Sequence, residues 1–497
     1  MRKGSVLVLF LLTILTSCQN KIDKEIKPLI EKDSEIDTRD WESLTVYLEN
    51  NKASNRSFFK DDLIDADKVQ SYISSMGSKM RPPLEVRFST SQVSSEALSV
   101  RFYLERSGSM VPYDAPQCTG IFKSAIVDLL NHFPNGDNPQ NLIYIVNNAV
   151  YPYPTNFTSF IKDKNIFQTT RGIGDPQYTD FAAIFDSILA NSRNNQLSIL
   201  VSDMIYSTKD MKNVNPQKTF NEAKGLTSAI FKPYILEKSA LIIRMDADFH
   251  GNYYSYDSPS GGKHYSGNRP YYFFVVGDNN VIERIYSDAA YRSFSKFETL
   301  KGFEHLYCFA PNGSGTISYY SILPSYTSNR GTFKPARDGR DVQNQIRAIS
   351  DIVADRASEK FQFAVAIDLS KIIVEEAYKT NPDNYKIQSL DNFTIESITA
   401  VSSADITPNN KRYMDKASHI MLLKTDKVKQ EQKITVSLLN KFPEWIVQSS
   451  SDDDRNTSAP DFATTTFGFQ YLMQGIYDAY YSSNEAYYTN FEITLKH

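Results

Sequence analysis

Short apolar runs alternate with amphipathic segments between residues 85 and 310. The runs are continuous, which is typical of strands buried on both faces of a sheet. The segments between them repeat apolar residues at helical spacing. The pattern therefore predicts an α/β domain with a doubly wound, mostly parallel sheet and helices on both faces. We expect strands at 98–104, 142–146, 197–202, 240–245 and 271–277, and helices at 121–133, 157–164, 180–189 and 217–236.

The pattern changes after residue 310. A helical period covers 341–358, and apolar and polar residues then alternate with a period of two, as in half-buried strands. Residues 335–497 are therefore predicted to form a β-rich accessory domain, sandwich-like or α+β. We expect strands at 361–369, 393–401, 419–424, 433–439 and 490–495, a helix at 467–481 and an exposed loop at 449–458.

A polar stretch rich in Gly, Ser and Tyr interrupts the α/β pattern at 246–270. A loop of this length in a compact domain is usually functional or mobile. It contains His250 and His264, but no cysteine or carboxylate stands at a fixed spacing from them. The two histidines are therefore a weak metal signal, and a plain polar insertion is the simpler interpretation.

The N-terminus combines a short basic region with a short apolar run. Arg2 and Lys3 precede an apolar stretch at 6–15 that is too short to span a bilayer. The letters LTSC follow and end at Cys18, and this order resembles the lipobox of bacterial lipoproteins. The resemblance implies a signal peptide at 1–18 and lipidation of Cys18, which anchors the protein to a membrane. An ordinary secretory peptide with a chance cysteine is the alternative.

The segment after Cys18 is polar. Residues 19–40 carry dense charge of both signs and few aromatic residues, so we expect a tether. Residues 41–84 contain a predicted strand at 43–48 and a predicted helix at 65–76, which we expect to pack on the following domain (85–310) as a preamble. The absence of a later apolar stretch of about twenty residues predicts a soluble, tethered chain.

Composition excludes one class of partner. The chain has 497 residues and a net charge of −4 spread along its length, so it lacks the basic surface that nucleic-acid binding requires. Besides Cys18 there are two cysteines, Cys118 and Cys308. An oxidising compartment permits a disulfide between them, and two separate buried thiols are the other interpretation.

Oxygen-bearing side chains follow two of the predicted strands and precede one predicted helix. The stretch FYLERSGSM at 102–110 places a carboxylate and two hydroxyls at alternate positions after the first strand. A threonine stands just before the helix at 180–189, and an aspartate ends the strand at 197–202. The carboxyl edge of such a sheet is where ligands usually bind. These five residues are Glu105, Ser107, Ser109, Thr179 and Asp203.

This set resembles the metal-ion-dependent adhesion site of von Willebrand factor type A (vWA) domains, which carries Asp-x-Ser-x-Ser, a later Thr and a later Asp. The resemblance begins near residue 98 and ends near residue 310. It implies a Rossmann-like vWA fold that binds Mg²⁺ or another divalent cation, with hydroxyls as direct ligands and carboxylates acting partly through water. It also implies that a carboxylate of a protein partner completes the metal shell.

The sequence departs from the family at Glu105, where the family has Asp. Glutamate is longer by one methylene, so either the loop relaxes or the metal binds weakly. Three interpretations stay open: a working adhesion site, a vWA fold with a weakened or vestigial site, and a coincidental Ser-Gly-Ser loop in another α/β fold.

Enzymatic motifs are missing. Ser107 lacks the flanking glycines of a nucleophile elbow, and the loop lacks the Gly-Lys-Ser ending of a phosphate loop. We therefore expect a binding protein and no enzyme, although a metal-assisted hydrolase is one alternative and an assembly lipoprotein with a vestigial site another. Gln19 after the lipidated cysteine predicts an outer-membrane location in the bacterial cell envelope.

Overall fold

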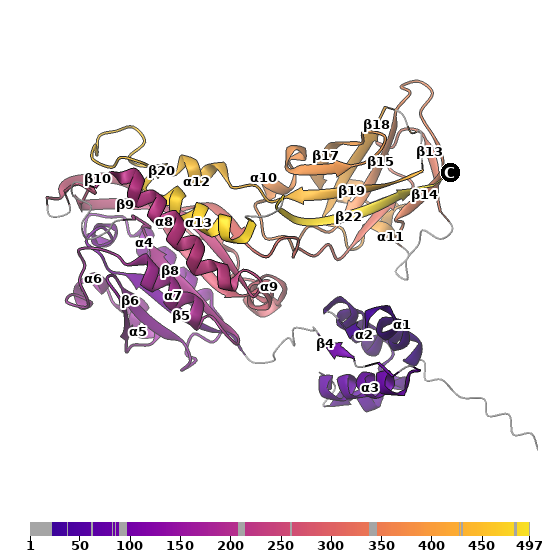
Figure 1. The fold of residues 1–497 in the computed structure, drawn as a ribbon, viewed down its shortest axis with the longest axis horizontal. Coiled ribbons are helices and arrows are strands. Elements are labelled where there is room, and N and C mark those ends of the chain that lie inside the picture. The colour runs from indigo at the N-terminus through magenta and orange to yellow at the C-terminus, as the bar shows by residue number, and fades with distance from the viewer. Residues whose placement is uncertain are drawn as a thin grey trace, which may run out of the picture. The chain divides into compact units, whose positions relative to one another are not determined.

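The computed structural model describes residues 22–36, 38–60, 63–81, 83–84, 86–88, 97–206, 214–258, 261–336, 345–426, 428, 431–481 and 485–496. The chain divides into two compact units, Met1–Ser95 and Glu96–His497 (Figure 1). The predicted signal peptide, with Cys18, lies outside the described residues. Among the helices that the structure describes, none is both long and apolar enough to cross a lipid bilayer.

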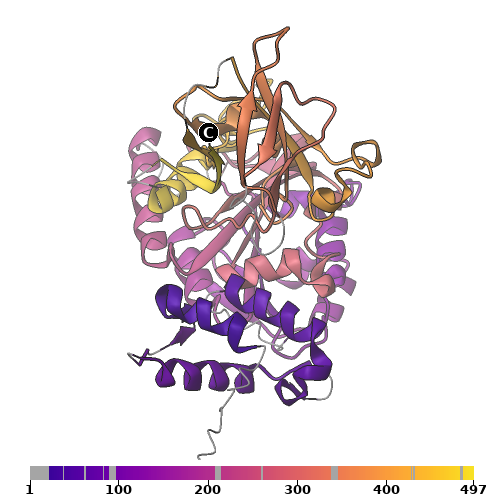
Figure 2. The same cartoon turned by 90° about the vertical axis from the view of Figure 1, so that its right-hand side faces the viewer.

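In its described residues, the first unit contains three α-helices, two short 3-10 helices and four very short strands (Figure 2, indigo). Its elements are α1 (Asp23–Asp33), β1 (Glu35–Ile36), α2 (Thr38–Asn50), β2 (Phe59–Lys60), β3 (Leu63–Ile64), α3 (Ala66–Lys79) and β4 (Arg87–Phe88). The helix predicted at 65–76 is confirmed by α3.

Two predictions for the first unit are wrong. Ile22, Ile26 and Ile30 recur every fourth residue and are buried in the core of this unit, so residues 22–36 are folded and do not form a tether. The strand predicted at 43–48 lies within α2, because Leu44 and Leu48 are spaced for one helix face and outweigh the β-branched residues between them. Whether this unit packs on the following one stays a prediction.

A mixed seven-stranded sheet is the framework of the second unit. The strand positions are confirmed, but the prediction of a mostly parallel sheet is wrong. Only β5 pairs in parallel, with β6 and β8, and the other four neighbouring pairs are antiparallel. In sheet order the strands are β11 (Phe303–Phe309), β9 (Lys238–Tyr253), β10 (Lys263–Asp278), β8 (Gln196–Ser202), β5 (Ser99–Glu105), β6 (Leu142–Val146) and β7 (Val150–Tyr153).

The hairpin of β9 and β10 replaces most of the loop predicted at 246–270. Each strand has 16 residues, and the pairing runs without interruption from Lys238 to Tyr253 on β9. Phe249 and Tyr253 point into the core while the residues between them are half-buried or exposed. The Gly, Ser and Tyr content of this stretch suggested a loop, but its backbone continues the pairing of the two strands.

Helices cover both faces of this sheet, as predicted. On one face lie α4 (Ile121–His132), α5 (Phe157–Lys162), α6 (Ile166–Thr169) and α9 (Asn279–Ser287), where Phe102 of β5 contacts Phe160 with ring centroids 5.5 Å apart. On the other face lie α7 (Phe181–Asn191) and α8 (Pro216–Phe231), where Phe274 of β10 contacts Phe185 at 5.4 Å.

Two further sheets confirm the β-rich C-terminal region. One contains β12 (Tyr320–Leu323), β15 (Phe361–Ile367), β18 (His419–Thr425) and β17 (Thr394–Ala400). The other contains β13 (Thr332–Pro335), β14 (Ala348–Val353), β22 (Tyr487–Leu495), β19 (Gln432–Leu439) and β16 (Tyr385–Gln388). The helix predicted at 341–358 is wrong where it is described, because Ile349 there pairs with Leu495 in the sheet. Short helices α10 (Glu376–Lys379) and α11 (Lys411–Met414) complete this part.

Between β19 and β22 the chain leaves the β-rich part and returns to the seven-stranded sheet. This excursion (residues 440–486) contains α12 (Glu444–Gln448), β20 (Ser450–Ser451), β21 (Thr466–Phe467) and α13 (Phe469–Tyr481). Figure 1 shows α13 beside α8, and the ring of Phe469 stacks on Tyr272 of β10 at 4.1 Å. The predicted accessory domain at 335–497 is therefore not a separate block, since this segment completes the core of the α/β part.

The two cysteines in the described part of the chain are both free. Cys308 is buried on β11, and the Cys118 thiol donates to the carbonyl oxygen of Pro112 at 3.3 Å. The interpretation of two separate thiols is confirmed.

Candidate metal centre

The first part of the candidate site is the turn that follows β5. Glu105 is the last residue of the strand, and the hydroxyls of Ser107 and Ser109 lie 3.0 Å apart in the turn. The backbone holds the turn in place, because the N–H of Gly108 donates to the carbonyl oxygen of Pro176 at 3.0 Å. This bond ties the turn to the segment that carries Thr179.

Thr179 lies immediately before α7. The helix begins after Asp180, whose carboxylate accepts a hydrogen bond from the N–H of Ala183 at 3.1 Å and caps the first turn. The capped start fixes the preceding Thr179, and its hydroxyl donates to Oε1 of Glu105 at 2.5 Å. Two of the predicted residues, 74 positions apart in the chain, are therefore in direct contact.

Asp203 follows the end of β8 and is 1% exposed. Its Oδ1 accepts a hydrogen bond from the N–H of Ile205 at 3.2 Å, whereas its Oδ2 is buried without a hydrogen-bond partner among the described residues. An unpartnered buried carboxylate oxygen is costly and is often explained by an ion or water. Met204, with a φ of 54°, turns the chain sharply away after this residue.

Ser202 is a member of this cluster that the sequence did not reveal. Its hydroxyl donates to Oε2 of Glu105 and accepts a hydrogen bond from the N–H of Met204 at 2.8 Å. It stands next to Asp203 in the sequence, and neighbouring side chains within a strand point to opposite faces. The chain turn after β8 is what allows both to contribute.

The buried carboxyl groups have raised pKa values. Burial, together with the charge of Asp203, raises the pKa of Glu105 to about 8, although the hydroxyls of Ser202 and Thr179 act to lower it. Burial also raises the pKa of Asp203, against the lowering effect of the Ser109 hydroxyl and the Arg269 charge. Ionised forms of both groups therefore need additional positive charge nearby.

Arg269 of β10 supplies part of that charge. It is 1% exposed, and its guanidinium lies 4.9 Å from the ring centroid of Tyr253 and 4.3 Å from that of Phe462. It also donates to the carbonyl oxygen of Phe462, in the excursion. Nearby Asp454 accepts from the Tyr253 hydroxyl at 2.8 Å, and burial raises the pKa of Asp454 to about 6. The segment predicted as an exposed loop at 449–458 thus contains a buried acid.

Arg106 lies within the turn but belongs to a different environment. It is 8% exposed and donates from Nη2 to the carbonyl oxygen of Phe167 at 3.4 Å, whereas its Nε has no partner in the described part of the chain. Burial and the positive charge of Arg171 lower the pKa of Arg106. Within the described residues neither arginine forms an ion pair.

The five predicted residues fit the chemistry of a hard divalent cation. They provide three hydroxyl and two carboxylate groups, the oxygen ligands that Mg²⁺ and Ca²⁺ prefer. In the described residues there is no group of three or more His, Cys, Asp and Glu side chains that could hold a metal ion. The orphaned Oδ2 of Asp203 is the observation that favours a cation.

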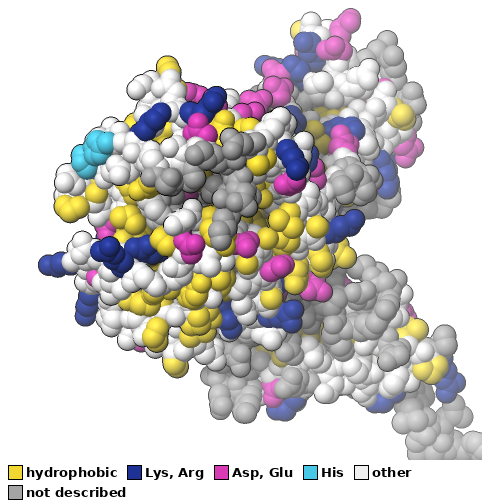
Figure 3. All heavy atoms as spheres, turned by 60° about the vertical axis from the view of Figure 1, so that its left-hand side comes forward, with side chains coloured by type: hydrophobic (Ala, Val, Ile, Leu, Met, Phe, Trp, Pro, Cys, Tyr) yellow, Lys and Arg dark blue, Asp and Glu magenta, His cyan; other side chains and the backbone are white. Residues whose placement is uncertain are grey.

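The two histidines noted in the sequence lie elsewhere, on the long hairpin. The rings of His250 and His264 are 4.8 Å apart, and Nδ1 of His250 lies 3.1 Å from the hydroxyl of Ser266. Histidine side chains are visible together at one edge of the face in Figure 3. They take no part in the hydroxyl cluster.

Comparisons with models of known protein families, with curated proteins and with solved structures find no match to this chain. The resemblance to vWA domains therefore stays a prediction made from the sequence.

Proposed function

We propose that the second unit binds a divalent cation, Mg²⁺ by preference, at the hydroxyl cluster after β5. The observation that carries the proposal is convergence: three chain segments bring the ligands together. Direct ligands would be the hydroxyls of Ser107, Ser109 and Thr179, with Glu105 and Asp203 supplying negative charge, partly through water. Burial disfavours the charged forms of both carboxyl groups and so raises their pKa values. A bound cation would offset this cost by stabilising the charged forms.

The proposal includes a vWA-like arrangement of the α/β part. The support is topological: β5 lies inside the sheet next to the central strand β8, is flanked by the parallel strands β6 and β8, and ends at the candidate turn. The other two site segments lie just before α7 and just after β8. The antiparallel β10 between β8 and β9 is a departure from the predicted sheet.

By analogy with vWA domains, the protein is proposed to be a binding protein and no enzyme. A carboxylate of a protein partner would complete the metal shell. The lipobox-like LTSC sequence supports a bacterial envelope lipoprotein that is anchored through Cys18 to the outer membrane.

A second function, an envelope assembly protein with a vestigial site, is favoured by one specific observation. Both carboxylate oxygens of Glu105 already accept hydrogen bonds, from Thr179 and Ser202. If Glu105 carries a proton, hydrogen bonds alone hold the cluster together. The cluster then has a structural role and needs no metal ion.

Calorimetric titration of the whole chain with MgCl₂ and with MnCl₂ distinguishes the metal-binding function from the structural one. The titration is done at a pH above the pKa of Glu105. We expect one cation per chain, and loss of binding in Asp203→Asn and Ser107→Ala. Ser350→Ala, on β14 of the β-rich part, is the matched control and should bind as the wild type does. A wild-type protein that takes up neither cation overturns the metal proposal in favour of the structural function.

A further inference from the structure

The long hairpin of β9 and β10 carries two histidines near its tip, on one face of the ribbon. His250 lies opposite Ser266 and His264 lies opposite Asn252, so the two histidines are diagonal neighbours on adjacent strands. The neighbouring Phe249 is buried, and side chains alternate along a strand, so His250 and His264 point away from the core. Figure 3 shows histidine side chains together at the surface.

The separation of the two rings fits two ligands of one metal ion. Their centroids are 4.8 Å apart and their planes are inclined by 78°. A ligating imidazole nitrogen lies about 2.0–2.1 Å from Zn²⁺, which places the ring centroid about 3.2 Å from the ion. Two such rings at an angle of about 90–110° around the ion have centroids about 4.5–5.2 Å apart. The observed separation lies within this range, so a shared ion does not require the strands to move apart.

Hydrogen bonding leaves ring nitrogens available for a metal ion. Nδ1 of His250 lies 3.1 Å from the hydroxyl of Ser266, and when Nδ1 carries the proton, the lone pair of Nε2 is free to ligate. His264 is exposed, and its ring nitrogens have no hydrogen-bond partner among the described residues. Both strands pair without interruption through these positions, so the backbone holds the two rings in place before an ion binds.

A carboxylate on the same face favours a cation. Asp248 stands two positions before His250 on β9 and therefore points to the same side of the strand. Its carboxylate accepts hydrogen bonds from the N–H of Thr119 and, at 2.9 Å, from the Thr119 hydroxyl. It therefore contributes negative charge without acting as a ligand. In the described residues, no set of three His, Cys, Asp or Glu side chains could hold an ion, so the two histidines stand as a pair.

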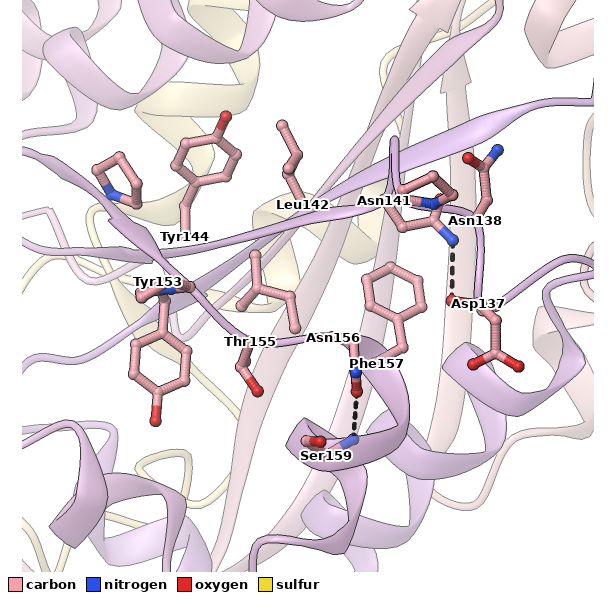
Figure 4. Close-up of a pocket in the computed structure, with 15 residues that line it drawn as sticks. Asp137, Asn138, Asn141, Leu142, Tyr144, Tyr153, Thr155, Asn156, Phe157 and Ser159 are labelled. Carbon is pink, nitrogen blue, oxygen red and sulfur yellow. Dashed lines mark hydrogen bonds between the residues drawn. The ribbon is translucent and has the colours of Figure 1, made fainter.

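A groove of about 590 Å³ beside β6 and β7 (Figure 4) contains no comparable set of ligands. Its described lining has no His and no Cys. Ile143 pairs with Tyr153 and Tyr144 pairs with Pro152, so the two tyrosines point to opposite faces of the sheet. The histidine pair is therefore the stronger candidate for a second ligand site.

We propose that His250 and His264 bind one divalent transition-metal ion, of the class of Zn²⁺, Ni²⁺ and Cu²⁺, through one ring nitrogen each. Imidazole is a preferred ligand of these ions, whereas Mg²⁺ and Ca²⁺ prefer oxygen. Water fills the remaining positions of the ion. The site shares no residue with the hydroxyl cluster after β5 and does not depend on it.

Calorimetric titration of the whole chain with NiCl₂ and with ZnCl₂, in excess MgCl₂, tests the proposal. We expect one Ni²⁺ or one Zn²⁺ ion per chain. His250→Gln and His264→Gln should each weaken binding at least tenfold, because a single imidazole cannot chelate the ion. His132→Gln is the matched control, since it removes an exposed histidine on α4 and should bind as the wild type does.

The hairpin site is distinguished from the hydroxyl cluster by Asp203→Asn, which should bind Ni²⁺ as tightly as the wild type. Three results overturn the proposal: a wild type that binds neither Ni²⁺ nor Zn²⁺, equal binding by the wild type and both hairpin variants, or loss of Ni²⁺ binding in a folded Asp203→Asn variant. The last result would place the ion in the hydroxyl cluster. A chain that binds Ni²⁺ at the hairpin and fails to bind Mg²⁺ would support this proposal alone.

Discussion

Glu105 and Asp203 are two acidic side chains that the fold buries almost completely within one cluster of hydroxyls. Burial disfavours the charged forms of both groups, and the charge of Asp203 further disfavours ionisation of Glu105. A cation that binds between them must therefore compete with protons. Because of this competition, the cation affinity of the proposed metal centre should depend strongly on pH.

We expect the Mg²⁺ affinity to rise with pH up to about 8, the pKa of Glu105. Well below that pKa, one proton released per cation bound corresponds to about a tenfold gain in affinity per pH unit. Calorimetry in two buffers of different ionisation enthalpy counts the protons released. Glu105→Gln should bind Mg²⁺ more weakly and lose most of this pH dependence. A wild-type affinity that does not change with pH contradicts the prediction.

The same pKa affects the metal-free fold. The folded protein keeps a proton on Glu105 at pH values where the unfolded chain has already released it. The free energy of unfolding should therefore fall as the pH rises from the ordinary carboxyl range toward about 8. Thermal melts in chelator over this range measure the fall, and Glu105→Gln should flatten the curve.

Arg106 is a buried cation without an ion-pair partner among the described residues. A buried charge without a counter-charge is costly to desolvate, and an apolar side chain of similar length removes that cost. We expect Arg106→Met to raise the free energy of unfolding by about 1 kcal/mol and the melting temperature by a few degrees. Arg193→Met, at an exposed arginine, is the control and should change little. A lower melting temperature for Arg106→Met than for the control contradicts the argument.

At the scale of single residues, the resemblance to the vWA motif singled out five oxygen-bearing residues, and the structure brings Thr179 and Glu105 among them into direct contact. That these residues bind a cation stays a prediction. Arg269 and Asp454 could not be predicted in the same way. Arg269 meets the Phe462 carbonyl group across 193 positions of sequence, and no local pattern encodes a contact of that range. Their roles depend on the return of the excursion to the first sheet.

At the scale of elements, α8 and α13 pack closely because glycine allows it. A Cβ atom on Gly475 of α13 would lie 2.5 Å from the carbonyl oxygen of Lys224 on α8. We expect Gly475→Ala to separate the helices and to lower the free energy of unfolding by about 1–3 kcal/mol.

Gly225 of α8 is the matched control, since a Cβ there meets no described atom within 4 Å. Gly225→Ala should stabilise the protein by about 0.5–1 kcal/mol, because alanine favours the helix. Thermal or denaturant unfolding compares the two variants. Equal effects of both substitutions would contradict close packing of the helices.

Element types were predictable where one period dominates the sequence, as in β5, α7 and β15. They were not predictable where composition conflicts with long-range pairing. Residues 246–270 look like a loop because of their composition, yet 246–253 pair with 263–270, and Arg269 in the second half is buried. Likewise, 348–353 has a weak helical pattern, but its backbone completes a sheet beside β22.

At the scale of the whole molecule, the excursion between β19 and β22 makes the α/β part and the β-rich part interdependent. Phe469 stacks on Tyr272, and the hydroxyl of Tyr480 donates to the carbonyl oxygen of Lys238 at 2.7 Å. Arg244 of β9 also donates to the Ser449 hydroxyl at 2.5 Å. Without the excursion, an apolar face and two buried arginines of the sheet would be exposed to solvent.

We therefore expect a fragment of residues 97–335, cut at the predicted domain boundary, to lack a cooperative thermal transition and to aggregate. A fragment of residues 97–497 should melt cooperatively and bind Mg²⁺ as the whole chain does, because the first unit has its own core. Circular dichroism, gel filtration and the calorimetric titration compare the two. A monomeric 97–335 fragment that binds Mg²⁺ with wild-type affinity would contradict this prediction. It would show that the α/β part folds as an independent domain without the excursion.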